Sequence, residues 1–193
     1  IVVDGVDIRE LAVIYELHRC AAEMKKPVLV GYDLAGTAMI AVYRYDLESI
    51  EPLRGELIPE KIEEFSGVQD AYREGVISEA AFLDYVYDAF TGPIKPLDVP
   101  TEQLEEILGR NDSDNRTFQI GTTSTVLSAL AVEAMRRILV GEKVRDTILV
   151  DLPSVVRRKS SNPNVLKKIP LLMRTLMVLK KRGERVKKML SDI

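Results

Sequence analysis

The sequence predicts an α/β fold in which helices pack against an open β-sheet. Two short apolar runs, IVVD at residues 1–4 and PVLVG at residues 27–31, are typical of buried strands, and apolar residues at helical spacing lie between them. A strand, a helix and a second strand in this order form a parallel crossover unit, which is right-handed in nearly all known proteins. The 193 residues are enough for one domain with a sizeable core and a small appendage.

The first quarter of the chain alternates between helix and strand patterns. The first helix is expected over residues 9–24, and a Lys-Lys-Pro sequence ends it. The second strand is expected to end at Gly31, and TAMIAVYRYD at residues 37–46 predicts a longer, partly alternating strand.

A second pair of elements lies late in the chain. GTTSTVLSALAVEAMRRILVGE at residues 121–142 is the clearest helical pattern, with possible N-caps at residues 122–124 and a C-terminal cap at Gly141. DTILVDL at residues 146–152 predicts another strand. The apolar residues of the helix form a broad face, so we expect the helix to pack on a sheet.

Between these parts, residues 47–118 have a different character. Proline and glycine recur at short intervals and predict short acidic helices, at residues 59–65, 78–90 and 101–108. Ser78 is the expected N-cap of the second helix. The third is expected to begin on Thr101, with Leu104 and Leu108 facing inward.

These patterns divide the chain into three parts. Residues 1–46 and 119–152 are expected to form the α/β core, residues 47–118 an insertion of helices, and residues 153–193 a set of basic C-terminal helices. No apolar run approaches the length of about 20 residues that spans a bilayer, so we expect no membrane partner.

Charge is distributed unevenly along the chain. The formal net charge is -3, but residues 152–193 carry 12 Lys/Arg and 2 Asp/Glu, whereas the first 151 residues carry 15 and 28. The basic segment has no aromatic residue for stacking on bases, and the rest of the chain is acidic, so a nucleic-acid partner is not expected. We expect the basic helices to fold onto the acidic body or onto a partner subunit.

Asp4 and Asp7, which follow the first strand, are the main candidate site residues. Strand ends in open α/β sheets face the ligand crevice, so acidic residues there can hold a metal or a ribose. The same spacing also lets Asp7 cap the following helix and Asp4 bond to a nearby loop. The two roles are compatible.

Other residues with chemical potential have simpler interpretations. His18, the one histidine, lies mid-helix with no evident Ser or Cys nucleophile beside it, which favours a structural role. Cys20 lies beside alanines and is expected to be a buried, inert thiol, and a single cysteine suits a cytoplasmic protein. Neither GxGxxG nor GxxxxGK[ST] occurs, so the chain carries no phosphate cradle of these types. The TTST at residues 122–125 offers backbone N–H groups to an anion, although capping explains it equally well.

Several of these patterns occur in an order that resembles one protein family. VVDGVD places Asp4 and Asp7 on the two acidic positions of a D-x-x-D-N motif, and Pro27 and Gly31 match a following P-L-x-x-G strand, with Gly36 near the next turn. A late helix that begins with small residues and the TILVD strand are also in place. In this order the chain resembles the ThiF/MoeB/HesA family of ubiquitin-activating-type adenylyltransferases.

This resemblance, over residues 1–46 and 119–151, implies a Rossmann-like nucleotide-binding fold. It implies adenylation, with Mg-ATP, of the C-terminal glycine of a ubiquitin-like or sulfur-carrier protein by a cytoplasmic enzyme that commonly dimerises. Asp7 matches the family residue that helps to hold Mg-ATP, so Asp7 is the expected metal and cofactor residue, together with Asp4 for the cofactor. A carboxylate there is chemically sensible, since Mg²⁺ prefers oxygen ligands.

The departures from the family pattern are as informative as the matches. Ile8 stands where the family usually has Asn, and the zinc-binding cysteine pairs of many members are absent. The family's GxGxxG unit and its catalytic Arg and Lys lie upstream of the D-x-x-D motif. We therefore expect this chain to be the C-terminal part of a longer adenylyltransferase, to hold no catalytic residue itself, and not to bind ATP tightly alone.

Two other functions remain open from the sequence. One is a non-catalytic interaction or dimerisation module that retains the activating-enzyme fold. The other is a nicotinamide-dependent Rossmann enzyme, which ranks last because dinucleotide binding also needs the missing Gly-rich turn.

Overall fold

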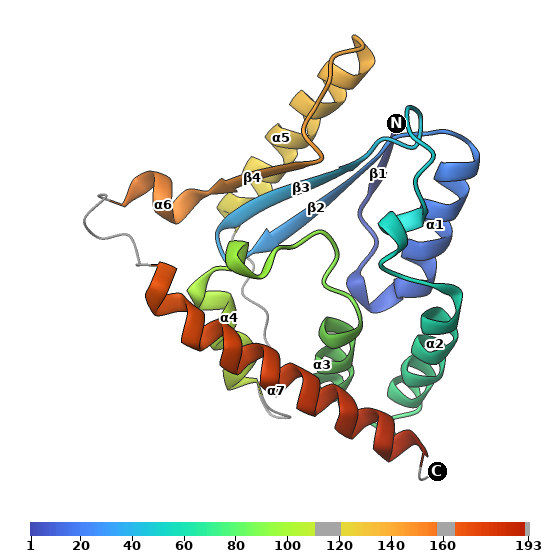
Figure 1. Ribbon diagram of the computed structural model, residues 1–193, viewed down its shortest axis with the longest axis vertical. Helices are drawn as coiled ribbons and strands as arrows, with labels where there is room; N and C mark the ends of the chain where they lie inside the picture. The colour runs from blue at the N-terminus through green and yellow to red at the C-terminus, as the bar shows by residue number, and fades with distance from the viewer. Residues whose placement is uncertain (111–120, 158–164, 192–193) are drawn as a thin grey trace.

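The computed structural model describes residues 1–110, 121–157 and 165–191 and has a mixed α/β fold (Figure 1). Within those residues the strands are β1 (Val2–Asp4), β2 (Val28–Leu34), β3 (Thr37–Tyr43) and β4 (Thr147–Asp151). The helices are α1 (Leu11–Glu23), α2 (Pro59–Arg73), α3 (Glu79–Ala89), α4 (Thr101–Gly109), α5 (Gly121–Leu139), α6 (Leu152–Val156) and α7 (Val165–Ser191). Single turns of 3-10 helix are η1 (Ile8–Glu10), η2 (Pro52–Gly55) and η3 (Pro96–Asp98).

The described strands form one open sheet in the order β1-β2-β3-β4. β1 and β2 are parallel, with Asp4 opposite Val30, so the predicted strand–helix–strand unit is present. β2–β3 and β3–β4 are antiparallel pairs. The sheet is therefore mixed, and the predicted α/β class is confirmed at this level.

The hairpin between β2 and β3 corrects both predicted strand limits. β2 continues past Gly31 to Leu34, because Ala35 and Gly36 alone make the turn, with φ of 46° and 98°. Two central residues with positive φ are the geometry that matches the twist of a hairpin. β3 stops at Tyr43 rather than at residue 46, because the backbone N–H groups of residues 47 and 48 turn back to Arg44 O.

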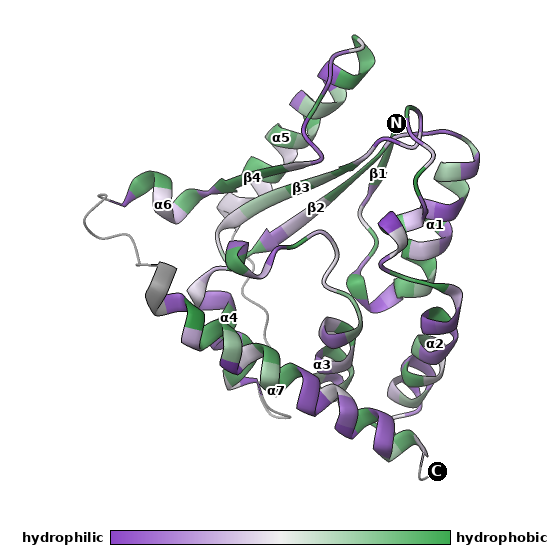
Figure 2. Ribbon diagram, in the orientation of Figure 1, coloured by the Kyte–Doolittle hydropathy of each residue, from purple (hydrophilic) through white to green (hydrophobic). Residues whose placement is uncertain are grey.

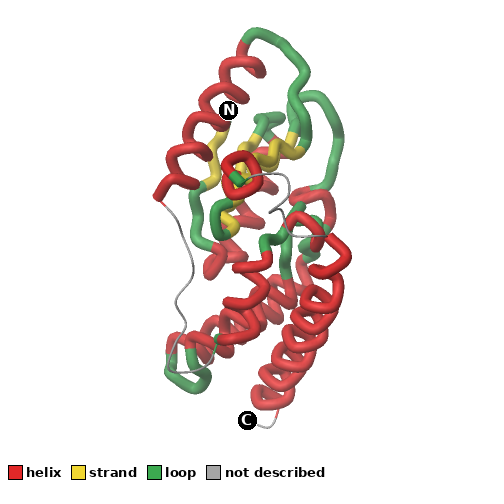
Figure 3. The backbone as a smooth tube through the Cα atoms, turned by 90° about the vertical axis from the view of Figure 1, so that its left-hand side faces the viewer, coloured by secondary structure: helices red, strands yellow, loops and turns green. Residues whose placement is uncertain are grey.

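β3 is buried along its whole length because helices cover both faces of the sheet. On one face Ile40 and Val42 pack with Ala134 and Ile138 of α5. On the other, Tyr43 joins the larger core with α1, α2 and α3. In Figures 1 and 3 α5 lies at one end of the molecule and α7 crosses the other end.

The helices of residues 47–118 belong to this larger core, in which Phe65 and Phe82 pack with the sheet and α1. The prediction that α2 ends at residue 65 is wrong: α2 reaches Arg73, because Val68 and Ala71 continue its buried face. Ser78 caps α3 as predicted, its Oγ accepting from the N–H of residue 81 at 3.2 Å.

α4 begins at Thr101 as predicted, but its N-cap residue is Pro100. Leu104 is buried as expected, but the other buried apolar residue of α4 is Ile107, and Leu108 is only half-buried. The proposed boundary at residues 118–119 lies outside the described residues.

α5 covers its expected range and ends as predicted. Gly141 has φ of 79°, its N–H donates to Ile138 O, and the next N–H donates to Arg137 O, which closes the helix. The predicted N-caps at residues 122–124 are wrong, because α5 already includes Gly121 and places these residues inside the helix; the N-cap residue itself lies outside the described residues. Thr123 is buried, and Thr125 Oγ1 donates to Gly121 O within the helix.

The basic C-terminal segment folds onto the acidic body, as predicted, but mainly as one 27-residue helix, α7, rather than as several. Leu172, Leu179 and Val186 face the body, and Figure 2 shows the helix becoming more hydrophilic toward its C-terminus. Arg182 Nη1 lies 3.3 Å from the carboxylate of Asp84. No helix of the described residues is both long and apolar enough to cross a membrane.

Candidate functional site

A cavity of about 500 Å³ lies at the carboxyl ends of the parallel strands β1 and β2. Its walls are mostly apolar and come from the β1–η1 turn, β2, α3, α4 and α7, with Leu104 and Leu172 among them. Asp4 and Asp7 both line it, as does Asp33 of β2. Open α/β sheets bind ligands at this edge, so the two predicted site residues lie where the sheet geometry places a site.

Asp7 stands at the start of η1, which leads directly into α1. Its Oδ1 accepts from the Arg9 N–H at 2.8 Å, so the predicted cap is confirmed for η1. Its Oδ2 lies 3.6 Å from Arg9 Nη1, and the side chain is 58% exposed. Asp7 therefore keeps a solvent-accessible carboxylate while it caps the turn.

The side chain of Asp4 is buried in the interior of the protein. Its Oδ1 accepts from the Val6 N–H at 2.9 Å, which confirms the predicted bond to a nearby loop. Its Oδ2 lies 3.4 Å from His18 Nε2, and its side chain is 1% exposed. Asp4 thus holds the turn that carries Asp7 through Oδ1, whereas its Oδ2 is near His18 without a hydrogen bond.

His18 is fully buried and contacts a second residue that the sequence did not indicate. Its Nδ1 lies 2.8 Å from Tyr45 Oη, which accepts from the Leu53 N–H at 2.9 Å. Burial raises the pKa of Tyr45 to about 12, so the phenol keeps its proton at neutral pH. The only local signal for Tyr45 is its place just after a buried strand.

Tyr45, His18 and Asp4 are ordered like the nucleophile, base and carboxylate of a catalytic triad. Tyr45 is only 3% exposed and its oxygen already accepts a backbone N–H, so no substrate reaches it. This geometry supports the structural role predicted for His18.

Cys20 corrects a sequence prediction. Its side chain is partly exposed rather than buried, because it lies on the outer side of α1 beside Glu16 and Arg19. A hydrogen bond to the Glu16 carboxylate raises the pKa of the thiol, and this disfavours the reactive thiolate. The expectation of an inert thiol is therefore supported for a different reason.

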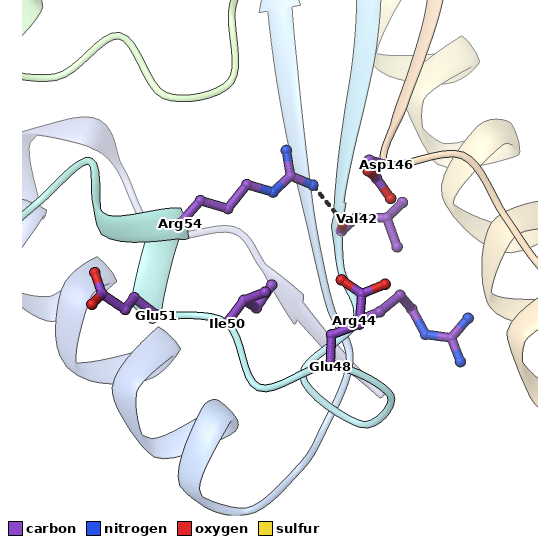
Figure 4. A pocket seen from close by; sticks show the side chains of 7 residues that line it. All are labelled: Val42, Arg44, Glu48, Ile50, Glu51, Arg54 and Asp146. Atoms are coloured by element: carbon purple, nitrogen blue, oxygen red, sulfur yellow. Dashed lines mark hydrogen bonds between the residues drawn. The ribbon is translucent and has the colours of Figure 1, made fainter.

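A second hollow, of about 390 Å³, lies at the opposite end of the sheet, beside η2 (Figure 4). Arg54 Nη2 donates to Val42 O at 3.1 Å, and Arg44 binds Asp46 through two hydrogen bonds of 2.8 and 2.7 Å. Arg44 and Glu51 point to opposite sides in Figure 4. Because these charged groups do not converge on one point, the hollow is a poor candidate for catalysis.

The backbone beside this hollow is strained. Leu53 and Arg54 have φ of 50° and 57°, and Gly55 follows with 75°. The left-handed conformation costs about 1–2 kcal/mol for each non-glycine residue. Leu53 is fully buried and its N–H is bound by Tyr45, so packing and one hydrogen bond hold the turn in place.

The residues of the cavity fit Mg-ATP in part. Within the described residues no three His, Cys, Asp or Glu side chains are grouped to hold a metal. Mg²⁺ is commonly held by one or two carboxylates together with waters and phosphates, so the exposed oxygens of Asp7 suit such an ion. No Lys or Arg of the described residues lines the cavity, so they supply no cation for the phosphates.

Comparisons of the chain with protein-family models, curated proteins and solved structures found no match. The family resemblance therefore rests on the residues of this sequence. What it implies for Asp4 and Asp7 stays a prediction.

Proposed function

We propose that the chain is the C-terminal part of an ATP-dependent adenylyltransferase that activates the C-terminus of a ubiquitin-like or sulfur-carrier protein. Its sheet would then be part of the Rossmann-like fold of the ThiF/MoeB/HesA family. One observation carries the proposal: Asp7 presents an exposed carboxylate at the carboxyl end of β1, on the wall of a cavity that the parallel strand β2 also lines. Ligands of open α/β sheets bind at this edge.

In this proposal the two aspartates have different tasks. Asp7 would hold the Mg²⁺ of Mg-ATP through its carboxylate, and the nucleotide, when bound, would supply the adenylyl group. Asp4 fixes the turn through Val6 N–H and His18. No residue of the chain is assigned a catalytic role, and by the family resemblance the protein acts as a cytoplasmic homodimer.

The second candidate is a non-catalytic interaction or dimerisation module. It is favoured by the lack of Lys and Arg among the described residues that line the cavity, because a triphosphate needs positive partners besides one metal ion. In this alternative the cavity and the cap at Asp7 are retained features of the fold that have no role in nucleotide binding or catalysis.

ATP–pyrophosphate exchange by the natural full-length protein separates the two candidates. The adenylyltransferase proposal predicts exchange that depends on Mg²⁺ and on a ubiquitin-like carrier with a C-terminal glycine. No exchange with any such carrier would favour the module.

A further inference from the structure

A continuous chain of buried contacts joins the η2 turn to the β1–η1 turn. The Leu53 N–H donates to Tyr45 Oη at 2.9 Å, and Tyr45 Oη lies 2.8 Å from His18 Nδ1. His18 Nε2 lies 3.4 Å from Asp4 Oδ2, and Asp4 Oδ1 accepts from the Val6 N–H at 2.9 Å. The side chains that make these contacts are at most a few per cent exposed, so water does not compete for the contacts.

The hydrogen-bond capacity of these groups assigns their protons. Tyr45 has one O–H and already accepts the Leu53 N–H, so its own proton needs an acceptor, and His18 Nδ1 is the acceptor in contact with it. An imidazole that accepts at Nδ1 carries its proton on Nε2. His18 Nε2 and Asp4 Oδ2 lie 3.4 Å apart without forming a hydrogen bond, and neither atom has another hydrogen-bond partner among the described residues, so a proton on Nε2 compensates the buried carboxylate electrostatically.

The series of contacts ends at two turns of the backbone, and each turn needs support. At one end Leu53 begins the left-handed turn that continues through Gly55. At the other, Asp4 binds the turn after β1, and Asp7 stands at the end of that turn. Residues distant in sequence, from β1, α1 and the segment after β3, are thereby held in one arrangement.

We propose that His18, as its neutral Nε2–H tautomer, is a positioning residue that fixes Asp4 and through it the turn that presents Asp7 to the cavity. That Asp7 is presented to Mg-ATP rests on the proposed function. The positioning itself does not, because it follows from contacts within the chain. His18 and Tyr45 touch no ligand in this account.

The tautomer is directly measurable, because His18 is the only histidine of the chain and its ring nitrogen signals need no assignment. The ¹⁵N NMR spectrum of the folded chain at neutral pH is expected to show a bare Nδ1 and a protonated Nε2. A protonated Nδ1, in either the other tautomer or the imidazolium form, would overturn the proposal.

Tyr45→Phe tests the positioning, because it removes the donor to Nδ1 while it keeps the ring in the core. We expect mixed tautomers of His18 and at least tenfold faster amide exchange at Val6 and Arg9, the N–H groups bound by Asp4 and Asp7. Tyr15→Phe, on the same helix as His18 but outside these contacts, is the matched control and is expected to change neither. Unchanged exchange at Val6 and Arg9 in a folded Tyr45→Phe protein contradicts the proposal.

His18→Gln and His18→Leu decide the matter if Tyr45→Phe does not fold. Gln keeps a side-chain N–H for Asp4 and is expected to retain protection of the Val6 amide, whereas Leu loses it at least tenfold. Equal protection in the two variants overturns the proposal. In the full-length protein, Tyr45→Phe is expected to raise KM for Mg-ATP about tenfold and Tyr15→Phe to leave it unchanged. If no exchange activity exists, the proposed function fails while the NMR results still decide the role of His18.

Discussion

Gly183 of α7 packs directly against Asp88 of α3. A Cβ atom at Gly183 would lie 2.6 Å from Asp88 Oδ2 and 3.1 Å from both Cβ and Cγ of the same residue. The absence of a side chain at this point lets α7 approach α3 closely. Since α7 also forms part of the cavity wall, this contact positions the wall as well as the helix.

Gly183→Ala is expected to destabilise the protein by about 1–2 kcal/mol, because the overlap with Asp88 outweighs the better helix propensity of alanine. Gly67→Ala is the matched control: Gly67 is also helical, and a Cβ there meets nothing within 4 Å. That substitution is expected to stabilise by about 0.5–1 kcal/mol. Urea unfolding measures both, and a stabilising Gly183→Ala would show that α7 is not docked as described.

Asp84 is the buried anion between α3 and α7, 3.6 Å from Arg110 Nη1 and 3.3 Å from Arg182 Nη1. Asp84→Ala is expected to cost about 3 kcal/mol, because it leaves buried positive charge with too little compensation. Glu102→Ala breaks the exposed pair with Arg157 and is expected to cost less than about 1 kcal/mol. Urea unfolding measures both variants. If Asp84→Ala and Glu102→Ala lowered the free energy of unfolding equally, Asp84 would be solvated in solution.

The carboxyl group of Glu56 is expected to make the stability of the protein depend on pH, and the sign of this dependence follows from the direction of its pKa shift. Partial burial raises the pKa of its carboxyl above the unfolded value, so the folded state binds this proton more tightly. The associated stability is fully present below the unfolded pKa of about 4.5 and is lost as pH rises through the folded pKa.

Glu56→Gln should therefore be more stable than the wild type at pH 7, by less than about 1 kcal/mol given its exposure. The two proteins should become equally stable near pH 4. Urea unfolding at both pH values measures this, and a Gln variant that is less stable at pH 7 would contradict the burial of Glu56.

Local patterns in the sequence predicted the features that depend on local physics. The parallel β1–α1–β2 unit followed from apolar periodicity, and the caps at Asp7 and Ser78 followed from short polar side chains placed before helical segments. Gly141 was predicted as a helix end because its left-handed conformation disfavours other residues.

The missed features depend on contacts between distant residues. α2 continues past Gly67, a residue of low helix propensity, because α1 and α3 bury its later turns. Tyr45 reaches His18 across 27 positions of sequence, and α7 reaches the cavity from the far end of the chain. Cys20 was expected in the core because its neighbours in the sequence are small, but it lies on the outer side of α1 and is partly exposed.

The central proposal is that Asp7 would hold the Mg²⁺ of Mg-ATP. Asp7→Asn tests it most directly, because asparagine still caps a helix turn while it removes the charge that a metal ion needs. Asp70→Asn on α2 is the control: its side chain is 68% exposed, and it is outside the cavity wall.

The measurement is Mg²⁺-dependent ATP–pyrophosphate exchange by the natural full-length protein with a ubiquitin-like carrier. The account predicts exchange in the wild type and in Asp70→Asn, and a loss of at least about tenfold in Asp7→Asn, which corresponds to about 1.4 kcal/mol of transition-state stabilisation. Wild-type exchange in Asp7→Asn would contradict it.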